Sequence, residues 1–494
     1  MNQKVTIFNN LTRSKLPFVP IKEGEVLFYS CGPTTYDFLH VGNARAFVVG
    51  DLINRIFKAL DYKVTFARNF TDVDDKIINR ANELKIDPLK HSAVYIAECE
   101  KDMDSLGMLQ PDHAPKVSET MPEIIRMIEV LMEKNFAYEV DGEVFFHVPM
   151  FKDYGKLSKK KLSELEHGKR VEVDKRKKHS SDFVLWKPAK PGEPSWDSPW
   201  SKGRPGWHIE CSAMIKKILG DTIDIHHGGV DLMFPHHENE IAQSEAANGR
   251  TFVNYWCHHE FLNFGSEKMS KSLGNVVTIR QFIEKFSGEV LRQLLSIVHY
   301  RTVMVWSDDA ITRAINDVER IHKFMINFEK AKKENLKDDS TSEMTGKFKG
   351  IIPKMKKNLA SDFNVPGAMA LFFSMIRQIN REFLDEQGKY EGKNKLGKEM
   401  VDVVEEVISF TKLSTGLIHD NPELILNKIN EAKKNFSVVE VLFSNEEIEK
   451  LVTQRTDARN SKNWALADEI RDKLGSAGIT IKDNPDGTVG WSYK

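Results

Sequence analysis

Two lysines and two hydroxyl side chains lie within one five-residue segment near the middle of the chain: Lys268, Met269, Ser270, Lys271 and Ser272. Lysine ammonium groups can spread the charge of a phosphate that is being transferred, and serine hydroxyls can donate to its non-bridging oxygens. The segment is flanked by Gly265 and Gly274, which would let the loop close over a nucleotide. The pattern therefore predicts a polyphosphate site and points to ATP, with a solvated turn as the alternative.

A second candidate phosphate element lies far upstream, at His40, Val41, Gly42 and Asn43. Beyond it, apolar residues recur at helical spacing, at Leu52, Ile53, Ile56, Phe57 and Leu60. The element is therefore predicted at the N-terminus of an amphipathic helix, where backbone N–H groups attract phosphate.

Strands expected on either side of this helix place it in a sheet. Residues 24–30 have the pattern of a buried strand that ends at the turn Cys31-Gly32-Pro33, and residues 63–69 have the pattern of the next strand. An order of strand, helix and strand implies a parallel sheet, and such sheets bind ligands at the C-terminal ends of their strands.

His236 and Glu240 are four residues apart in a predicted helix, so they share one face and could bind one metal ion. A surface hydrogen-bonding pair would have the same spacing. Two cysteines favour the metal, because Cys31 ends a predicted strand and Cys211 comes just before the sheet resumes at residues 222–226. Two thiolates, an imidazole and a carboxylate would suit zinc.

The composition is that of a large protein without a dominant charge. A length of 494 residues predicts roughly three to four domains. Because 71 basic and 72 acidic residues leave a formal net charge of -1, a nucleic-acid partner would need a local basic patch. Four cysteines are too few for a disulfide framework, and Cys99 and Cys257 are interpreted as packing residues in a reducing compartment. No apolar run suits a signal peptide or a membrane span, which predicts a soluble cytoplasmic protein.

The remaining segments differ in pattern. Residues 155–190 carry twelve Lys/Arg against five Asp/Glu, which predicts an insertion with either a solvated basic surface or a nucleic-acid contact. Helical periodicity from Asp308 to about residue 420 predicts a helical bundle. The C-terminal segment is expected to form a helix capped by Ser444 and Glu447, a second helix whose apolar positions include Trp464, ended by Gly475, and a hairpin over residues 479–491.

Several stretches resemble a known family. Residues 40–43 look like the HIGH element of class I aminoacyl-tRNA synthetases, and residues 268–272 match their KMSKS loop letter for letter. Further stretches resemble the cysteinyl-tRNA synthetase family in particular: CGPTTYD at 31–37, NFTDVDDK at 69–76, GRPGWHIECS at 203–212 and DLMFPHHENE at 231–240. The resemblance covers nearly the full length of the chain.

This resemblance implies an α/β fold, in which a Rossmann-type catalytic domain with an insertion is followed by an α-helical bundle and a small C-terminal α/β anticodon-binding domain. The expected boundaries are 1–120 and 205–256 for the two halves of the catalytic domain, 121–204 for the insertion, 257–307 for the KMSKS-bearing region that contacts the tRNA stem, 308–440 for the bundle and 441–494 for the anticodon-binding domain.

The resemblance also implies the reaction. L-cysteine and ATP would give cysteinyl-adenylate, and the cysteinyl group would pass to the terminal adenosine of tRNA(Cys). The expected residues are His40, Asn43, Lys268 and Lys271 for catalysis; Gly42, Lys268, Met269, Ser270, Lys271 and Ser272 for ATP; Thr71, Trp207 and Asp231 for cysteine; Cys31, Cys211, His236 and Glu240 for one Zn²⁺; and Arg455, Arg459 and Trp491 for tRNA. Mg²⁺ is expected to enter with ATP, and the chain is expected to be a monomer.

Two positions depart from the family pattern. Asn43 stands where the HIGH element has its second histidine, and an amide can donate to a phosphate but cannot carry positive charge. His227 stands in the family's usual glycine run, where its side chain could crowd or contact the adenosine.

Three other functions fit part of these motifs. A cysteine ligase of mycothiol biosynthesis, which joins activated cysteine to a sugar amine, would keep the zinc set and both phosphate motifs but should lack the C-terminal region. A zinc hydrolase with Glu238 as general base would leave residues 268–272 unexplained. A non-catalytic tRNA-binding protein would require that Asn43 had cost the chain its activity.

Overall fold

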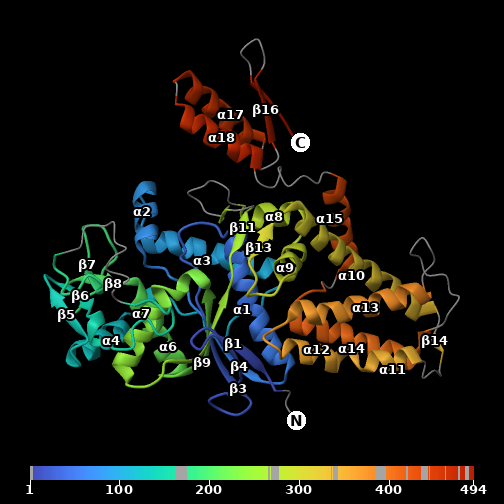
Figure 1. The fold of residues 1–494 in the computed structure, drawn as a ribbon, viewed down its shortest axis with the longest axis horizontal. Helices are drawn as coiled ribbons and strands as arrows, with labels where there is room; N and C mark the ends of the chain where they lie inside the picture. The colour runs from blue at the N-terminus through green and yellow to red at the C-terminus, as the bar shows by residue number, and fades with distance from the viewer. Residues whose placement is uncertain are drawn as a thin grey trace.

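The computed structural model describes residues 4–161, 175–264, 267–268, 277–334, 336–337, 343–383, 396–418, 421–434, 443, 445–461, 463–476, 479–483 and 489–493 (Figure 1). Within this part of the chain, no helix is both long enough and apolar enough to cross a membrane.

A four-stranded parallel sheet forms the centre of the N-terminal half of the molecule. Its strands are β3 (Glu25–Ser30), β4 (Lys63–Arg68), β9 (Ile223–Gly229) and β10 (Val253–His259), in the order β10-β9-β3-β4. The expected parallel sheet is confirmed, and α1 (Val41–Ala59) connects β3 to β4. Because the chain leaves β3 toward β4 on one side while β9 lies on its other side, a crevice forms at the C-terminal ends of β3 and β9.

The insertion forms a second, antiparallel sheet beside the first. It has the order β5-β6-β7-β8, with β5 (Ala137–Val140), β6 (Glu143–Phe146), β7 (Phe183–Pro188) and β8 (Gly203–Pro205). Other elements of the first half are the hairpin of β1 (Thr6–Asn9) and β2 (Ser14–Pro17), the helices α2 (Asp75–Leu84), α3 (Pro88–Ser105) and α4 (Met121–Glu133), and the 3-10 turns η1 (Val117–Glu119) and η2 (Val148–Met150). Two helices then lead back to the central sheet, α6 (Trp207–Leu219) before β9 and α7 (His236–Asn248) after it, with η3 (Val230–Met233) between β9 and α7.

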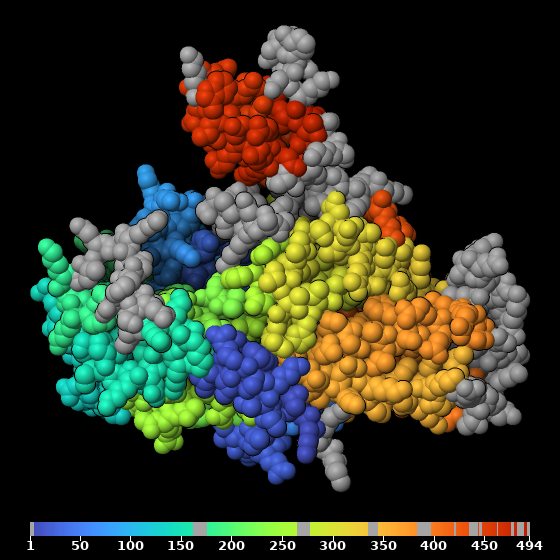
Figure 2. Space-filling model, in the orientation of Figure 1, coloured from blue at the N-terminus to red at the C-terminus, as the bar shows by residue number. Residues whose placement is uncertain are grey.

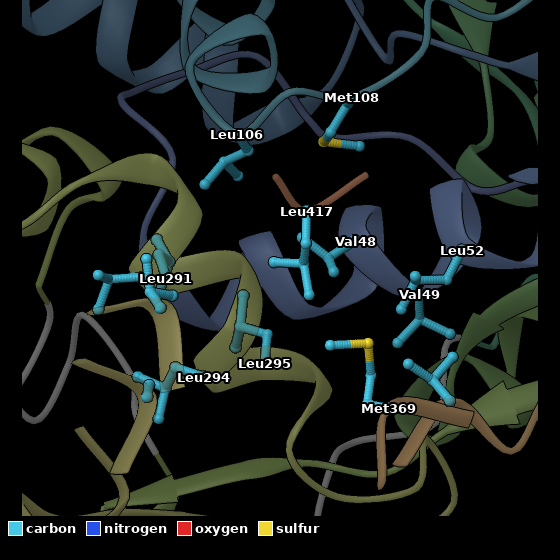
Figure 3. Packing of buried hydrophobic residues seen from close by; sticks show 14 of the residues in the cluster. Val48, Val49, Leu52, Leu106, Met108, Leu291, Leu294, Leu295, Met369 and Leu417 are labelled. Atoms are coloured by element: carbon cyan, nitrogen blue, oxygen red, sulfur yellow. The ribbon is translucent and has the colours of Figure 1, made fainter. Parts of the chain in front are cut away.

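Helix α1 is buried along most of its length and joins the sheet to the helical half of the molecule. Figure 3 shows Val48, Val49 and Leu52 of α1 packed near Leu291, Leu294 and Leu295 of α9 (Gly288–Ser296). A buried ion cluster lies in the same region, where the Asp51 carboxylate accepts from Arg55 Nε at 2.8 Å and from Arg292. Burial alone would raise the pKa of Asp51, but Arg292 and Arg55 lower it. Since α1 begins at the crevice, this packing fixes one wall of the site.

The expected helical bundle is present. It contains α10 (Asp308–Glu334), α11 (Glu343–Lys349), α12 (Ile351–Leu359), α13 (Val365–Phe383), α14 (Lys398–Thr415) and α15 (Pro422–Lys434), with the short pair β14 (Leu336–Lys337) and β15 (Leu396–Gly397). Between the sheet and the bundle lie β11 (Leu262–Phe264), β12 (Glu267–Lys268), α8 (Ile279–Lys285), α9 and β13 (Met304–Trp306).

The C-terminal segment projects from the rest of the molecule, as the red part of Figure 2 shows. It contains α17 (Asn445–Asn460), α18 (Trp464–Ser476) and a hairpin of β16 (Ile479–Asp483) and β17 (Val489–Tyr493). Two details differ from expectation: α18 includes Gly475, and Trp464 at its start is 58% exposed. Ser444 lies outside the described residues, so its predicted cap stays a prediction.

Candidate active site

A cavity of about 390 Å³ opens at the C-terminal ends of β3 and β9. It brings together residues from distant parts of the sequence: Cys31, Gly42, Asn43, Thr71, Trp207, Cys211, Asp231 and His236, together with His40. The topology explains this meeting, because the turn after β3, the start of α1 and the turn after β9 all reach the same edge of the sheet.

Four predicted metal ligands converge at one end of this cavity. The donor atoms of Cys31, Cys211, His236 and Glu240 all lie within 4.8 Å of one another. Cys31 follows β3, Cys211 lies on α6, and His236 and Glu240 share one face of α7 as their spacing predicted. Glu240 Oε1 lies 2.9 Å from His236 Nε2 without hydrogen-bond geometry, so this buried oxygen has no hydrogen-bond partner in the described part of the chain. A soft, thiolate-rich donor set with an orphaned carboxylate oxygen fits a metal ion.

The four groups perturb one another electrostatically. The hydrogen bond from the Cys31 thiol lowers the pKa of Cys211 to about 6, and the same contact raises the pKa of Cys31. Burial alone would lower the pKa of His236, but Glu240 and Cys211 raise it to about 10. Burial alone would raise the pKa of Glu240, but His226 and His236 lower it to about 2. The pocket thus favours thiolate at Cys211 and carboxylate at Glu240, whereas Cys31 and His236 would each lose a proton when a metal ion binds.

A layer of histidines behind the ligands was missed in the sequence. His226 Nε2 lies 2.9 Å from Glu240 Oε2, and His237 Nε2 lies 3.4 Å from the Cys31 sulfur and is linked through Nδ1 to His258. Cys31, His226, His237 and Glu240 form a second group whose donor atoms lie within 4.8 Å of one another. The available signal was the crowding of histidine at residues 226–227 and 258–259, which lie in β9 and β10. Partners of this kind orient metal ligands.

The three residues expected to hold cysteine all line the cavity. Trp207 begins α6, and its ring stacks on that of His236 with centroids 4.2 Å apart. Thr71 Oγ1 accepts from Asn69 Nδ2 at 3.2 Å, and Asp231 lies in η3. The indole therefore forms a wall beside a candidate metal ligand.

His40 and Asn43 form the N-terminal cap of α1. His40 Nδ1 accepts from the Asn43 backbone N–H, and Asn43 Oδ1 accepts from the His40 backbone N–H, each at 3.2 Å. This arrangement places the proton of a neutral His40 ring on Nε2 and leaves the Asn43 NH₂ group as a donor. At Gly42, a Cβ would lie 2.9 Å from His40 Nδ1, so a side chain would crowd the cap.

The chain returns to His40 after the lysine loop. The Val41 N–H donates to Val277 O at 2.9 Å, and the Ile279 N–H donates to Leu39 O at 3.0 Å. Met269, Ser270, Lys271 and Ser272 lie outside the described residues, and only the backbone of Lys268 is described, in β12. The structure therefore places the segment that follows the loop, residues 277–279, beside the candidate phosphate element at residues 40–43.

His227 does not face the cavity. Its ring is buried, with Nδ1 2.9 Å from Ser30 Oγ and Nε2 3.1 Å from His259 Nδ1, and burial lowers its pKa to about 3. The neighbouring Gly228 and Gly229 do line the cavity. A Cβ at Gly228 would lie 2.6 Å from His237 Cε1, and one at Gly229 would lie 2.4 Å from Asp231 Oδ1. The departure at residue 227 therefore leaves the glycine surface of the pocket intact.

The predicted tRNA contacts differ in exposure. Arg455, on α17, is only 8% exposed. Arg459 and Trp491 are half-buried. Among the residues of this domain whose exposure is described, the large exposed aromatic side chain is that of Trp464, which was assigned to the helix core from sequence.

Comparisons with known proteins cover the same regions. Residues 17–316 match the family described as tRNA synthetases class I (C) catalytic domain, residues 354–408 match the DALR domain, and residues 445–489 match the cysteinyl-tRNA ligase anticodon binding domain. The chain is 44% identical to the cysteine–tRNA ligase of Geotalea uraniireducens over 499 residues and to that of Halalkalibacterium halodurans over 487 residues; each alignment covers 99% of both proteins.

Solved structures of low identity share the fold. A Mycobacterium tuberculosis methionyl-tRNA synthetase in complex with methionyl-adenylate aligns with a TM-score of 0.57 at 14% identity, over 82% of this chain and 93% of the other. A ternary LeuRS-tRNA-LeuAMS complex from Agrobacterium radiobacter K84 aligns with a TM-score of 0.58 at 10% identity, over 83% of this chain and 86% of the other. The class I fold expected from the sequence is confirmed.

Proposed function

The chain belongs to the cysteine–tRNA ligase family of class I aminoacyl-tRNA synthetases, and from this premise we propose how its residues perform the reaction. The protein joins L-cysteine to tRNA(Cys) at the expense of ATP. The observation that carries the mechanism is the convergence of Cys31, Cys211, His236 and Glu240 at the end of a cavity that also contains His40 and Asn43. We expect a cytoplasmic monomer.

Cysteine must be distinguished from serine, which differs by one atom. Pocket shape alone separates such pairs by about 10², whereas an accuracy of about 10⁴ requires about 5.5 kcal/mol of differential binding. The four ligands would hold Zn²⁺, which supplies preferential binding of soft sulfur over a neutral hydroxyl. Trp207 would wall the thiol pocket, while Thr71 and Asp231 would hold the polar end of the amino acid.

The activation step needs no protein nucleophile. The substrate carboxylate attacks the α-phosphorus of ATP and pyrophosphate leaves, so the protein contributes position and charge stabilisation. His40 Nε2–H and the Asn43 NH₂ group would donate to the phosphates, because the reciprocal cap uses the other polar atoms of both side chains. Lys268 and Lys271 would neutralise the leaving pyrophosphate, and Mg²⁺ would enter with ATP.

In the transfer step, a hydroxyl of the terminal adenosine of tRNA attacks the carbonyl carbon of the adenylate and AMP leaves. The C-terminal segment would read the anticodon, in agreement with the family that matches residues 445–489. Trp464, exposed at the start of α18, is the better candidate for stacking on an unpaired base, and Arg459 and Trp491 remain candidates.

The alternatives account for less of the molecule. A cysteine ligase acting on a sugar amine would not need the C-terminal domain. A hydrolase with Glu238 as base is disfavoured, because both oxygens of that carboxylate accept backbone N–H groups of residues 155–158.

The test is ATP–pyrophosphate exchange driven by cysteine or by serine, with metal content measured on the same sample and charging of tRNA(Cys) measured in parallel. Exchange that depends on cysteine, is accompanied by about one zinc per chain and leads to charging is expected. Equal exchange with serine would refute the role of the metal, and exchange without charging would favour the sugar ligase.

A further inference from the structure

Helix α7 has a second buried face that holds the insertion. Glu238 lies two residues from each of the ligands His236 and Glu240 and is completely buried. Its Oε1 accepts from the backbone N–H groups of Gly155 at 3.0 Å and Leu157 at 3.3 Å, and its Oε2 accepts from that of Ser158 at 2.7 Å. A carboxylate that accepts three backbone N–H bonds fixes the chain at that point in position and direction.

Contacts next to Glu238 also hold the start of this segment against α7. Tyr154 donates its hydroxyl to Asn239 Oδ1, and Lys156 pairs with Glu245, so contacts from three positions of α7 hold the segment that begins at residue 154. The turn is tight: Gly155 has φ of 93°, and a Cβ there would lie 2.1 Å from Lys160 O. We call Glu238 and the backbone of residues 155–158 the latch.

The latch marks the start of the most basic part of the chain. Lys159, Lys160 and Lys161 follow it directly. Lys160 is exposed, and its Nζ lies 4.0 Å from the centre of the Phe234 ring. Phe234 stands between Leu232 and His236, which both line the active-site cavity. The latch thus leads into Lys160, whose ammonium lies beside the segment that lines the cavity, whereas the Lys159 ammonium donates to Leu11 O and Lys156 O.

The far end of the basic segment is also fixed. The Lys178 N–H donates to the Tyr138 hydroxyl, which donates to Asp182, each at 2.7 Å. An exposed lysine held near a cavity that must admit the end of a polyanion favours contact with its phosphates over a merely solvated surface.

We propose that Glu238 is a positioning residue for the tRNA-dependent step: through the latch it holds Lys160 where it meets the phosphates of the tRNA acceptor end as that end enters the cavity. The proposal rests on the proposed function. It gives a second task to α7, the helix that carries two of the candidate metal ligands. That task is needed only after the adenylate has formed.

The test compares the two half-reactions in the full-length enzyme with zinc bound. Glu238→Gln keeps the volume but turns an NH₂ group toward backbone N–H donors, so the latch should open. Zinc per chain and tRNA-independent exchange with cysteine should stay within about twofold, while kcat/KM for charging tRNA should fall about tenfold, the loss expected for a charge-assisted hydrogen bond. Glu129→Gln, at a surface carboxylate of α4 paired with Arg126, is the matched control and should alter neither reaction.

Lys160→Gln tests the same idea without touching a buried group. It should raise KM for tRNA, leave exchange unchanged, and reduce the slope of log affinity against log salt by about 0.7 to 0.9, the value for one phosphate contact. The proposal is overturned if Glu238→Gln reduces zinc content and exchange in proportion to charging, or if Lys160→Gln leaves the KM for tRNA and the salt slope unchanged. Absence of cysteine-dependent exchange in the unmodified enzyme would instead refute the proposed function itself.

Discussion

Asn43 offers a way to separate what a side chain does for the fold from what it does for catalysis. Its Oδ1 accepts from the His40 backbone N–H at 3.2 Å, which is the capping interaction, and its NH₂ group is the proposed phosphate donor. Asn43→Asp keeps an acceptor for the cap and places a negative charge in the first turn, where the helix dipole favours it. The same change removes the donor and brings negative charge toward the phosphates. Asn43→Ala removes the cap and the donor together.

The expected magnitudes differ enough to be measured. Loss of the cap in Asn43→Ala should lower the free energy of unfolding by about 1 kcal/mol, whereas Asn43→Asp should change it by less than about 0.5 kcal/mol. Loss of one hydrogen-bond donor to the charge that develops on a phosphate lowers kcat by about 10² to 10³, so Asn43→Ala should lower kcat for exchange by about this factor. Asn43→Asp should lower kcat by at least as much.

The assay is cysteine-dependent ATP–pyrophosphate exchange at saturating ATP, combined with denaturant unfolding of the same samples. If Asn43→Asp retained exchange within about threefold of the unmodified enzyme, Asn43 would act only as a cap and the phosphate assignment would be wrong. If Asn43→Ala lost stability and activity while Asn43→Asp lost activity alone, both assignments would stand.

Three further changes test other parts of the structure. Cys211→Ser should lower the zinc content after dialysis to well below one per chain and abolish the preference for cysteine over serine in exchange; an unchanged zinc content would show that the ligand set is wrong. Asp51→Asn should lower the free energy of unfolding by about 3 to 5 kcal/mol, because it leaves the guanidinium of Arg292, which is completely buried, without its carboxylate. The pKa of Asp51 is lowered in the folded protein, so its contribution to the free energy of unfolding is present above the ordinary carboxyl pKa and is lost as pH falls through the folded value. The difference in unfolding free energy between the unmodified protein and Asp51→Asn should therefore shrink in acid. A difference that stays constant with pH would refute the ion-pair explanation. Trp464→Ala should raise KM for tRNA roughly 5- to 150-fold, the range for one base stacked on an aromatic ring, without changing tRNA-independent exchange; an unchanged KM would exclude stacking.

The parts of the site that could be predicted are those that depend on order along the chain. A strand that ends at Cys31 and a helix that begins at His40 fix both residues at one edge of a parallel sheet, whatever the rest of the molecule does. The spacing of His236 and Glu240 likewise fixes a shared helix face. The convergence of Cys31, His236 and Glu240 with Cys211 could be expected only from the resemblance. No local sequence pattern shows that α6, which carries Cys211, lies beside the turn after β3.

Burial was harder to predict than position. Periodicity alone did not show that Arg455 lies inside the C-terminal domain and that Trp464 lies outside it, because α17 and α18 have only partly apolar faces and a two-helix unit covers little surface. His226 and His237 could not be assigned either, since a buried histidine most often satisfies its hydrogen bonds within the core. Their roles depend on Glu240 and Cys31, which are distant in sequence.

Helix α7 shows why a polar sequence can still form a buried helix. Residues 236–244 are all buried although most of them are polar, so the helix cannot owe its place to an apolar face. Each buried polar group must be satisfied or it destabilises the fold. Contacts on one side of α7 come from the candidate metal ligands and the histidines behind them, and on another side from the backbone of residues 155–158. A helix held in this way is positioned mainly by its polar contacts, and the two sets of contacts lie on different sides of it. Such a helix would let a ligand-selecting site and a tRNA-guiding insertion share one rigid support.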